Sequence, residues 1–90
     1  MKKISIIIPM YNVARYIETC VASVVNQDIH SEFIEILLVD DESPDNSLEL
    51  ARQMAKENSS IKIFSQKNKG LGGARNTGIK NAVGEYLIFL

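Results

Sequence analysis

Residues 34–47 read IEILLVDDESPDNS, and this stretch decides the fold. Its unbroken apolar run, Ile36–Val39, is typical of a strand that is buried on both faces of a parallel sheet. Two carboxylates, Asp40 and Asp41, follow directly at the carboxyl end of that strand. Ligands of open α/β sheets bind in the crevice outside this edge. The two aspartates are therefore the first candidate binding residues.

The remaining sequence alternates short apolar runs with helical patterns. Ser43 and Pro44 predict the start of the helix after the central strand, as its N-cap and its first helical residue. Pro9 is expected to end the first strand, and Gly84 is expected to cap the third helix. Further strands are expected at residues 4–8, 61–64 and 86–90, and helices at 14–26, 44–57 and 74–82. This order predicts an α/β fold: a parallel sheet of about four strands, helices on both faces and right-handed crossovers.

The composition is that of one globular domain at most. The 90 residues are 46% hydrophobic and 23% charged, and the net charge of -1 gives no reason to expect nucleic acid as a partner. The single cysteine, Cys20, excludes an internal disulfide and is expected in the core. No apolar run approaches the ~20 residues that span a bilayer. The expected location is therefore the cytoplasm.

The paired aspartates have two interpretations. Asp40 and Asp41 could accept hydrogen bonds from a base or a ribose, or hold a divalent cation. Alternatively, they are turn residues whose charge favours the positive end of a helix dipole. The position of the pair at the carboxyl edge of a sheet favours binding.

A glycine-rich basic segment at residues 66–73 is expected to form a loop that leads into the third helix. Glycines at this position let backbone N–H groups approach a phosphate, and Arg75 could hold the phosphate oxygens. The alternative is a flexible loop with a solvated arginine. Neither standard phosphate motif fits, because Arg75 stands where the dinucleotide fingerprint needs glycine, and Ile79 rather than lysine follows Gly78.

The other polar candidates are weaker. Tyr11 and Asn12 follow the first strand, where a tyrosine could stack on a base or simply cover the edge of the sheet. His30 lies in a polar connection and is expected to be solvated and without a role. No His, Cys and acid cluster has the spacing of metal ligands.

Four motifs occur in order: SIIIPMYN at residues 5–12, LLVDDES at 37–43, NKGLGGARNTGI at 68–79 and GEYLIFL at 84–90. Together they resemble the N-terminal part of family 2 glycosyltransferases, which have the Rossmann-like GT-A fold. The resemblance covers essentially all 90 residues. It implies the strand order 3-2-1-4 and makes residues 1–90 the incomplete N-terminal, nucleotide-sugar-binding part of a GT-A domain.

The resemblance also implies a function. The parent protein would transfer a sugar, with inversion, from a nucleoside diphosphate donor to an acceptor hydroxyl in polysaccharide biosynthesis, with a UDP-sugar favoured. The acceptor would be a saccharide or lipid-linked. The nucleotide-binding residues that it implies are Pro9, Tyr11, Asn12, Asp40, Asp41, Ser43, Gly72 and Arg75.

In this family the metal-binding Asp-x-Asp begins just after the strand that GEYLIFL matches, and the catalytic base lies further on. The resemblance therefore implies that the chain is a piece of a larger domain that stops one residue short of these groups. Ligands for Mn or Mg would lie beyond Leu90, as would any membrane-associated part. The 90 residues alone are expected to hold no metal and to be inactive.

Two other classes of protein remain open, and so does the self-association of the chain. A response-regulator receiver also has a strand that runs into paired acids, but here the pair follows the second strand, and too few residues remain for the later acid and lysine. A non-catalytic α/β binding module, stable only with a partner, is the other class. In the full glycosyltransferase fold the fourth strand would be internal, so in this 90-residue chain residues 86–90 would form a bare hydrophobic sheet edge, which predicts a homodimer or larger assembly through the fourth strand.

Overall fold

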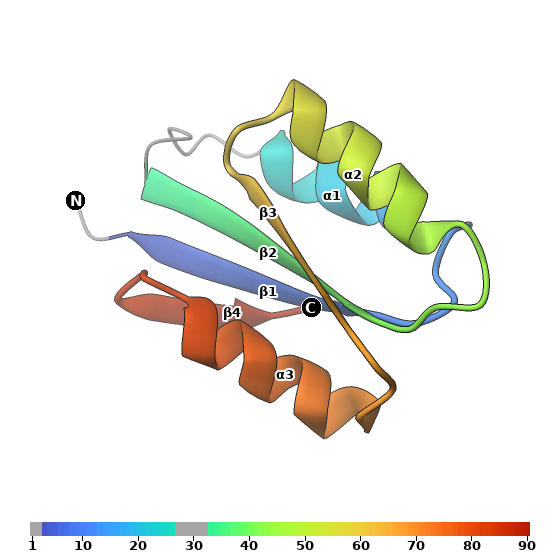
Figure 1. Ribbon diagram of the computed structural model, residues 1–90. Coiled ribbons are helices and arrows are strands. Elements are labelled where there is room, and N and C mark those ends of the chain that lie inside the picture. Colours follow the sequence, from blue (N-terminus) through green and yellow to red (C-terminus); the bar gives the residue numbers. More distant parts are fainter. Residues whose placement is uncertain (1–2, 27–32) are drawn as a thin grey trace.

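The computed structural model describes residues 3–26 and 33–90, and the predicted connection at 27–32, with His30, lies outside the described residues. It is an α/β fold whose strands and helices alternate along the chain (Figure 1). The elements are β1 (Ile4–Met10), α1 (Ile17–Val25), β2 (Ile34–Asp41), α2 (Ser47–Glu57), β3 (Ile61–Gln66), α3 (Gly70–Asn81) and β4 (Tyr86–Phe89).

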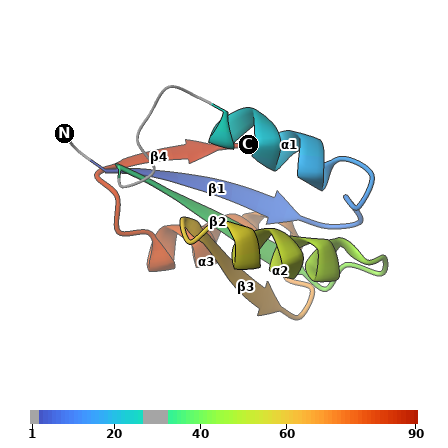
Figure 2. The same ribbon diagram turned by 90° about the horizontal axis from the view of Figure 1, so that it is seen from above.

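The four strands form one parallel sheet in the order β3-β2-β1-β4, which confirms the predicted order. Helices α1 and α2 lie side by side on one face of the sheet, and α3 covers the other face (Figure 1). All four strand arrows point the same way (Figure 2). The carboxyl ends of the strands therefore meet at one edge, as the sequence predicts.

The core lies on both faces of β1 and β2, and every residue of β2 is buried. Alternate residues of β1 serve the two faces: Ile6 and Ile8 belong to the cluster with α1 and α2, whereas Ile7 packs beneath Gly78 of α3. Cys20 is partly buried against the first cluster, as predicted. Across the described ranges, no helix is both long and apolar enough to cross a membrane.

The prediction that Pro9 ends the first strand is wrong, because β1 continues through Pro9 to Met10. The Ile7 carbonyl accepts a hydrogen bond from the N–H of Leu90, so the backbone groups of Ile7 point toward β4. Two residues on, the nitrogen of Pro9 points the same way, past Phe89, the last paired residue of β4. The missing N–H of Pro9 therefore costs no ladder bond.

Three predicted helix starts are too early or too late, each because of a contact with a segment that is distant in the sequence. Helix α1 begins at Ile17 rather than at residue 14, and α2 begins at Ser47 rather than at Pro44, because both preceding segments hydrogen-bond to each other. Helix α3 begins at Gly70, four residues before its predicted start, because the carboxylate of Asp41 binds the first N–H groups of this helix. Half of the glycine-rich segment, residues 70–73, is thus helix.

The prediction that Gly84 caps α3 is also wrong, because Ala82 occupies the C-cap position in an extended conformation. Gly84 instead lies against the start of β1. A Cβ atom at residue 84 would lie 2.7 Å from the nitrogen of Ser5 and 2.9 Å from the carbonyl oxygen of Lys3. Two strand ends also differ: β3 runs on to Gln66, and β4 stops at Phe89.

We predict that Gly78→Ala destabilises the fold where α3 crosses β1. The added Cβ would lie 3.1 Å from Cγ1 and 3.2 Å from Cδ1 of Ile7, which is fully buried. Overpacking of this kind costs about 1–3 kcal/mol of unfolding free energy. The matched control is Gly72→Ala in the same helix, where a Cβ meets nothing within 4 Å, so helix propensity should add about 0.5–1 kcal/mol. Urea unfolding measures both, and an unchanged stability for Gly78→Ala would contradict the packing.

Candidate nucleotide-binding cavity

A cavity of about 350 Å³ opens at the carboxyl edge of the sheet, between the β1–α1 loop and the start of α3. This volume falls within the range of small-ligand sites. Most of its lining is apolar, and Asp41 supplies a carboxylate. The lining residues are Pro9, Met10, Tyr11, Val13, Asp41, Asn68, Gly70, Leu71 and Ala74.

Asp41 is buried at the end of β2 and joins the sheet to α3. Its Oδ1 accepts hydrogen bonds from Nε2 of Gln66 at 3.0 Å and from the N–H of Lys69 at 2.8 Å, and its Oδ2 accepts one from the N–H of Gly70 at 3.0 Å. The carboxylate therefore caps α3 from a distant point in the sequence. Oδ2 accepts one such bond among the described residues, so it can accept a further hydrogen bond from a ligand in the cavity.

The pKa of Asp41 lies below its usual value. The hydrogen bond from Gln66 lowers the pKa most; burial raises it, but the N–H groups of Lys69 and Gly70 and the positive charge of Lys69 add to the lowering. Asp41 is therefore ionised at neutral pH, and an ionised carboxylate only accepts hydrogen bonds. The cavity thus presents an acceptor to any ligand that enters it.

Asp40 does not share this cavity, although the sequence pairs it with Asp41. Successive side chains of a strand point to opposite faces, so Asp40 lies on the side of its cross-strand neighbour Met10 in the cluster with α1 and α2. Its Oδ2 accepts a hydrogen bond from the N–H of Ser43 at 3.2 Å, and its buried Oδ1 has no partner within the described part of the chain. That part also contains no cluster of three His, Cys, Asp or Glu side chains, so these residues do not fit a metal site.

The β1–α1 loop forms the opposite wall. Tyr11 lines the cavity with half of its surface exposed, and Val13 lies beside it. Asn12 has a left-handed backbone, with φ of 56°, a conformation that asparagine tolerates better than most residues. Asn12 does not line the cavity, and its N–H donates to Oγ of Ser43 at 3.1 Å. Ser43 likewise does not line the cavity, and its hydroxyl supports this loop.

Two residues that the sequence analysis missed, Asp45 and Ser47, also hold the β1–α1 loop. The N–H of Ala14 donates to Oδ2 of Asp45 at 3.0 Å, and the N–H of Val13 donates to Oγ of Ser47 at 2.9 Å. Oδ1 of Asp45 accepts from the hydroxyl of Ser47 at 2.5 Å and from its N–H at 3.1 Å. One sequence feature could have pointed to these residues. Short polar side chains occur at every second position after the strand, at Ser43, Asp45 and Ser47.

The Asp45 carboxyl has a pKa below its usual value. The hydrogen bond from the Ser47 hydroxyl is the main cause of the lowered pKa; burial raises the pKa, and the N–H groups of Ala14, Ser47 and Asp45 itself add to the lowering. The carboxylate that joins the two loops is therefore ionised at neutral pH.

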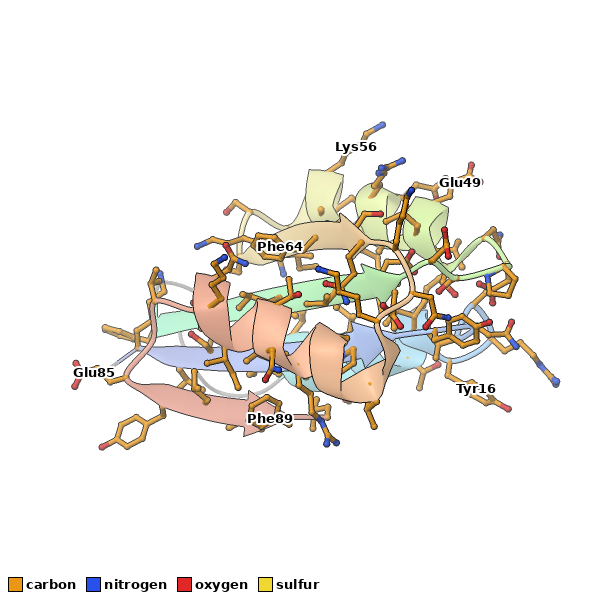
Figure 3. All side chains as sticks on the ribbon, turned by 60° about the horizontal axis from the view of Figure 1, so that its bottom comes forward. Tyr16, Glu49, Lys56, Phe64, Glu85 and Phe89 are labelled. Carbon is orange, nitrogen blue, oxygen red and sulfur yellow. The ribbon has the colours of Figure 1, made fainter. Side chains whose placement is uncertain are left out.

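Gly72 and Arg75 lie in the first two turns of α3, at the same edge of the sheet as Asp41, but neither lines the cavity. Gly72 is exposed. The guanidinium of Arg75 lies 5.9 Å from the ring centre of Phe89, which Figure 3 shows at the end of β4 beside α3. The lining instead includes Met10, Val13, Asn68, Gly70, Leu71 and Ala74, which the sequence analysis had not named.

Solved glycosyltransferases share this architecture over nearly the whole chain. S. aureus TarS 1–349 in complex with UDP-GlcNAc superposes with a TM-score of 0.89 at 32% sequence identity, over 98% of this chain and 26% of TarS 1–349. The mannosyltransferase PcManGT from Pyrobaculum calidifontis, in complex with GDP-Man and Mn²⁺, gives a TM-score of 0.89 at 26% identity, over 96% of this chain and 26% of its own. The fold is the N-terminal part of a GT-A fold.

The chain belongs to glycosyl transferase family 2, whose family model matches residues 5–90. It is 48% identical over 87 residues to the uncharacterized glycosyltransferase EpsJ of Bacillus subtilis, and 45% identical over 87 residues to the cholesterol galactosyltransferase of Borreliella burgdorferi. Each alignment covers 97% of this chain but only 25% and 24% of the relative. The chain therefore spans about a quarter of the length of these curated relatives.

Proposed function

We propose that the protein transfers a sugar from a nucleoside diphosphate sugar to an acceptor hydroxyl, with inversion, and that these 90 residues bind the nucleoside end of the donor. The observation that carries this proposal is the cavity at the carboxyl edge, with the ionised carboxylate of Asp41 in an otherwise mostly apolar wall. Such a cavity suits a flat base that offers an N–H group. Family membership supports the reaction class.

The chemistry of Asp41 favours some bases over others. Uracil and guanine present ring N–H groups that donate to a carboxylate, whereas adenine has no ring N–H on its pairing edge and only its exocyclic NH₂ donates there. TarS is described with UDP-GlcNAc and PcManGT with GDP-Man, which are donors of these two kinds. We favour uridine for this chain, with Pro9 and Tyr11 flanking the base. Asn12, Asp40 and Ser43 would support this end of the site.

The diphosphate of the bound donor would extend from the cavity along the start of α3. The first-turn N–H groups of a helix and its positive dipole end attract phosphate oxygens, and Gly72 leaves the backbone there open to approach. Arg75 would then turn toward the phosphates. Because the residues described here do not fit a metal site, we place the Mn or Mg ligands, and the catalytic base, in other parts of the parent protein.

Four further expectations, one about the 90 residues and three about the parent protein, stay predictions. These 90 residues alone would be inactive. The acceptor would be a saccharide or a lipid-linked molecule. The location would be cytoplasmic, and other parts of the protein could associate with a membrane.

The test is a calorimetric titration of the full-length protein with UDP, GDP and ADP in the presence of Mn²⁺. We expect UDP to bind most tightly and ADP at least about tenfold more weakly. A base without a matching ring N–H would leave the carboxylate of Asp41 without a donor from the ligand. Equal affinity for ADP and UDP would contradict the role of Asp41 in base selection. No binding of any of the three would contradict the proposed function.

We also predict that the 90-residue chain associates through β4, the exposed edge strand. Every residue of β4 is exposed, and its sequence YLIF carries no charge or proline that would block edge pairing. Light scattering at tens of micromolar should therefore detect dimers or larger species, most simply with two β4 strands paired. Ile88→Lys places a charge on this edge and should restore the monomer. If the unmutated 90-residue chain were monomeric under the same conditions, that would contradict the prediction.

A further inference from the structure

Three successive backbone N–H groups of the β1–α1 loop donate to two side chains of the β2–α2 loop and to the first side chain of α2. The donors are residues 12, 13 and 14, and the acceptors are Ser43, Ser47 and Asp45, at 3.1, 2.9 and 3.0 Å respectively. The two loops are about thirty residues apart in the sequence and meet only through the fold. We name these three acceptors the loop clamp.

The backbone of both loops is shaped for this contact. Asn12 and Glu42 are the two described non-glycine residues with positive φ, at 56° and 60°. Each stands just after a strand, where a left-handed residue reverses the direction of the chain. Such conformations are disfavoured for most residues and persist where the surrounding structure holds them. The loop clamp supplies that surrounding structure for Asn12.

The loop clamp lies next to the cavity without lining it. Ser47 is fully buried, and neither Asp45 nor Ser43 belongs to the lining. The loop that it holds does belong to the lining, through Tyr11 and Val13. Sheet pairing fixes β1 only as far as Met10, and α1 starts at Ile17. Between these two points the carbonyl of Val13 accepts from the N–H groups of Tyr16 and Ile17, and the loop clamp ties residues 12–14 to the neighbouring segment.

We propose that Asp45 is a positioning residue: together with Ser43 and Ser47 it holds the Tyr11 wall of the nucleotide cavity in place, so that donor affinity depends on a carboxylate that does not touch the donor. This inference rests on the proposed function, because it assumes that the cavity binds a nucleotide. Asp45 carries the most weight among the three, since its two oxygens join both loops: Oδ2 binds Ala14, and Oδ1 binds Ser47.

The test is Asp45→Asn in the full-length protein. An amide has one acceptor oxygen, so this change keeps the contact with either Ser47 or Ala14 and faces the other N–H with an NH₂ group. We expect the affinity for UDP, measured by calorimetry, to fall about tenfold. Amide hydrogen exchange of peptides that cover residues 11–16 should become about tenfold faster, because one amide oxygen cannot accept from both segments and the contact between them weakens.

Two control variants separate positioning from loss of stability. Glu49→Gln makes the same carboxylate-to-amide change on the exposed face of α2 (Figure 3), where Glu49 has no hydrogen bond or ion pair within the described ranges. Its affinity for UDP should change by less than about twofold. Glu35→Gln weakens a buried network at the opposite edge of the sheet, and it should lower stability while leaving the affinity for UDP unchanged.

Each outcome decides the inference. Faster exchange with weaker UDP binding in Asp45→Asn, and neither in Glu49→Gln, supports it. Faster exchange with unchanged affinity overturns it, as does unchanged exchange. Failure of the wild-type protein to bind UDP or GDP rejects the proposed function, and the inference falls with it. If Asp45→Asn does not fold, Ser47→Ala provides the same two measurements through the N–H of Val13.

Discussion

Asp41→Ala is expected to weaken UDP binding by about 1–3 kcal/mol, the usual range for a lost hydrogen bond to a charged group. The same change removes the acceptor of the N–H groups of Lys69 and Gly70 at the start of α3. Loss of an N-cap costs about 0.5–2 kcal/mol of unfolding free energy. One substitution should therefore lower both donor affinity and stability, because one carboxylate lines the cavity and caps the helix beside it.

Calorimetry with UDP and urea unfolding measure these two effects on the full-length protein. The matched control is Glu42→Gln at the next residue, an exposed carboxylate outside the cavity that accepts a long hydrogen bond, 3.5 Å, from the N–H of Asn68. It should leave the affinity for UDP within about twofold of wild type. Unchanged affinity in Asp41→Ala would show that the nucleoside end of the donor binds elsewhere.

Glu35→Ala is expected to be the most destabilising change. Glu35 is buried in β2 at the edge opposite the cavity, and it accepts hydrogen bonds from the hydroxyl of Ser5 at 2.5 Å, Nζ of Lys62 at 2.6 Å and the N–H of Val83 at 2.6 Å. Removing it leaves several donors without their acceptor. We expect a loss of about 2–4 kcal/mol, somewhat below the cost of breaking a fully buried ion pair, because Lys62 is 44% exposed and regains water.

Urea unfolding of the wild type and Glu35→Ala at neutral pH measures this loss. The control is Glu57→Ala at the exposed end of α2, which should change the unfolding free energy by less than about 0.5 kcal/mol. A loss below about 1 kcal/mol for Glu35→Ala would mean that the network is weaker in solution than its geometry indicates.

The same carboxylate predicts how stability depends on pH. Burial raises the pKa of Glu35, but hydrogen bonds from Lys62, Ser5 and the N–H of Val83, together with the charge of Lys62, hold it below its ordinary value of 4.5. Because the pKa of Glu35 is lower in the folded state than in the unfolded state, its ionisation stabilises the fold. This stabilisation is complete above the pKa of the unfolded state and is lost as the pH falls through the pKa of the folded state. Below pH 4.5 the wild type should therefore lose more stability than Glu35→Gln. Parallel pH profiles would contradict this sign.

The sequence by itself determined the alternation of strands and helices. The apolar run Ile36–Val39 is buried on both faces because helices cover both sides of a parallel sheet, and such a run predicts that arrangement directly. The four motifs in order added the strand order and the family, and the structure and the family match confirm both. The alternation depends on local composition, which a sequence displays, whereas the strand order and the family came from the resemblance that the motifs carry.

The tertiary structure decided the helix boundaries and the membership of the site. Asp40 and Asp41 are adjacent in sequence but lie on opposite faces, because a strand alternates its side chains, and only Asp41 reaches the cavity. Helix α3 begins at Gly70 because Asp41, from another strand, binds the N–H groups there. Asp45 and Ser47 hold a loop about thirty residues away. Such contacts form only when distant segments meet, so a local pattern can show that these side chains are polar but not which partners they bind.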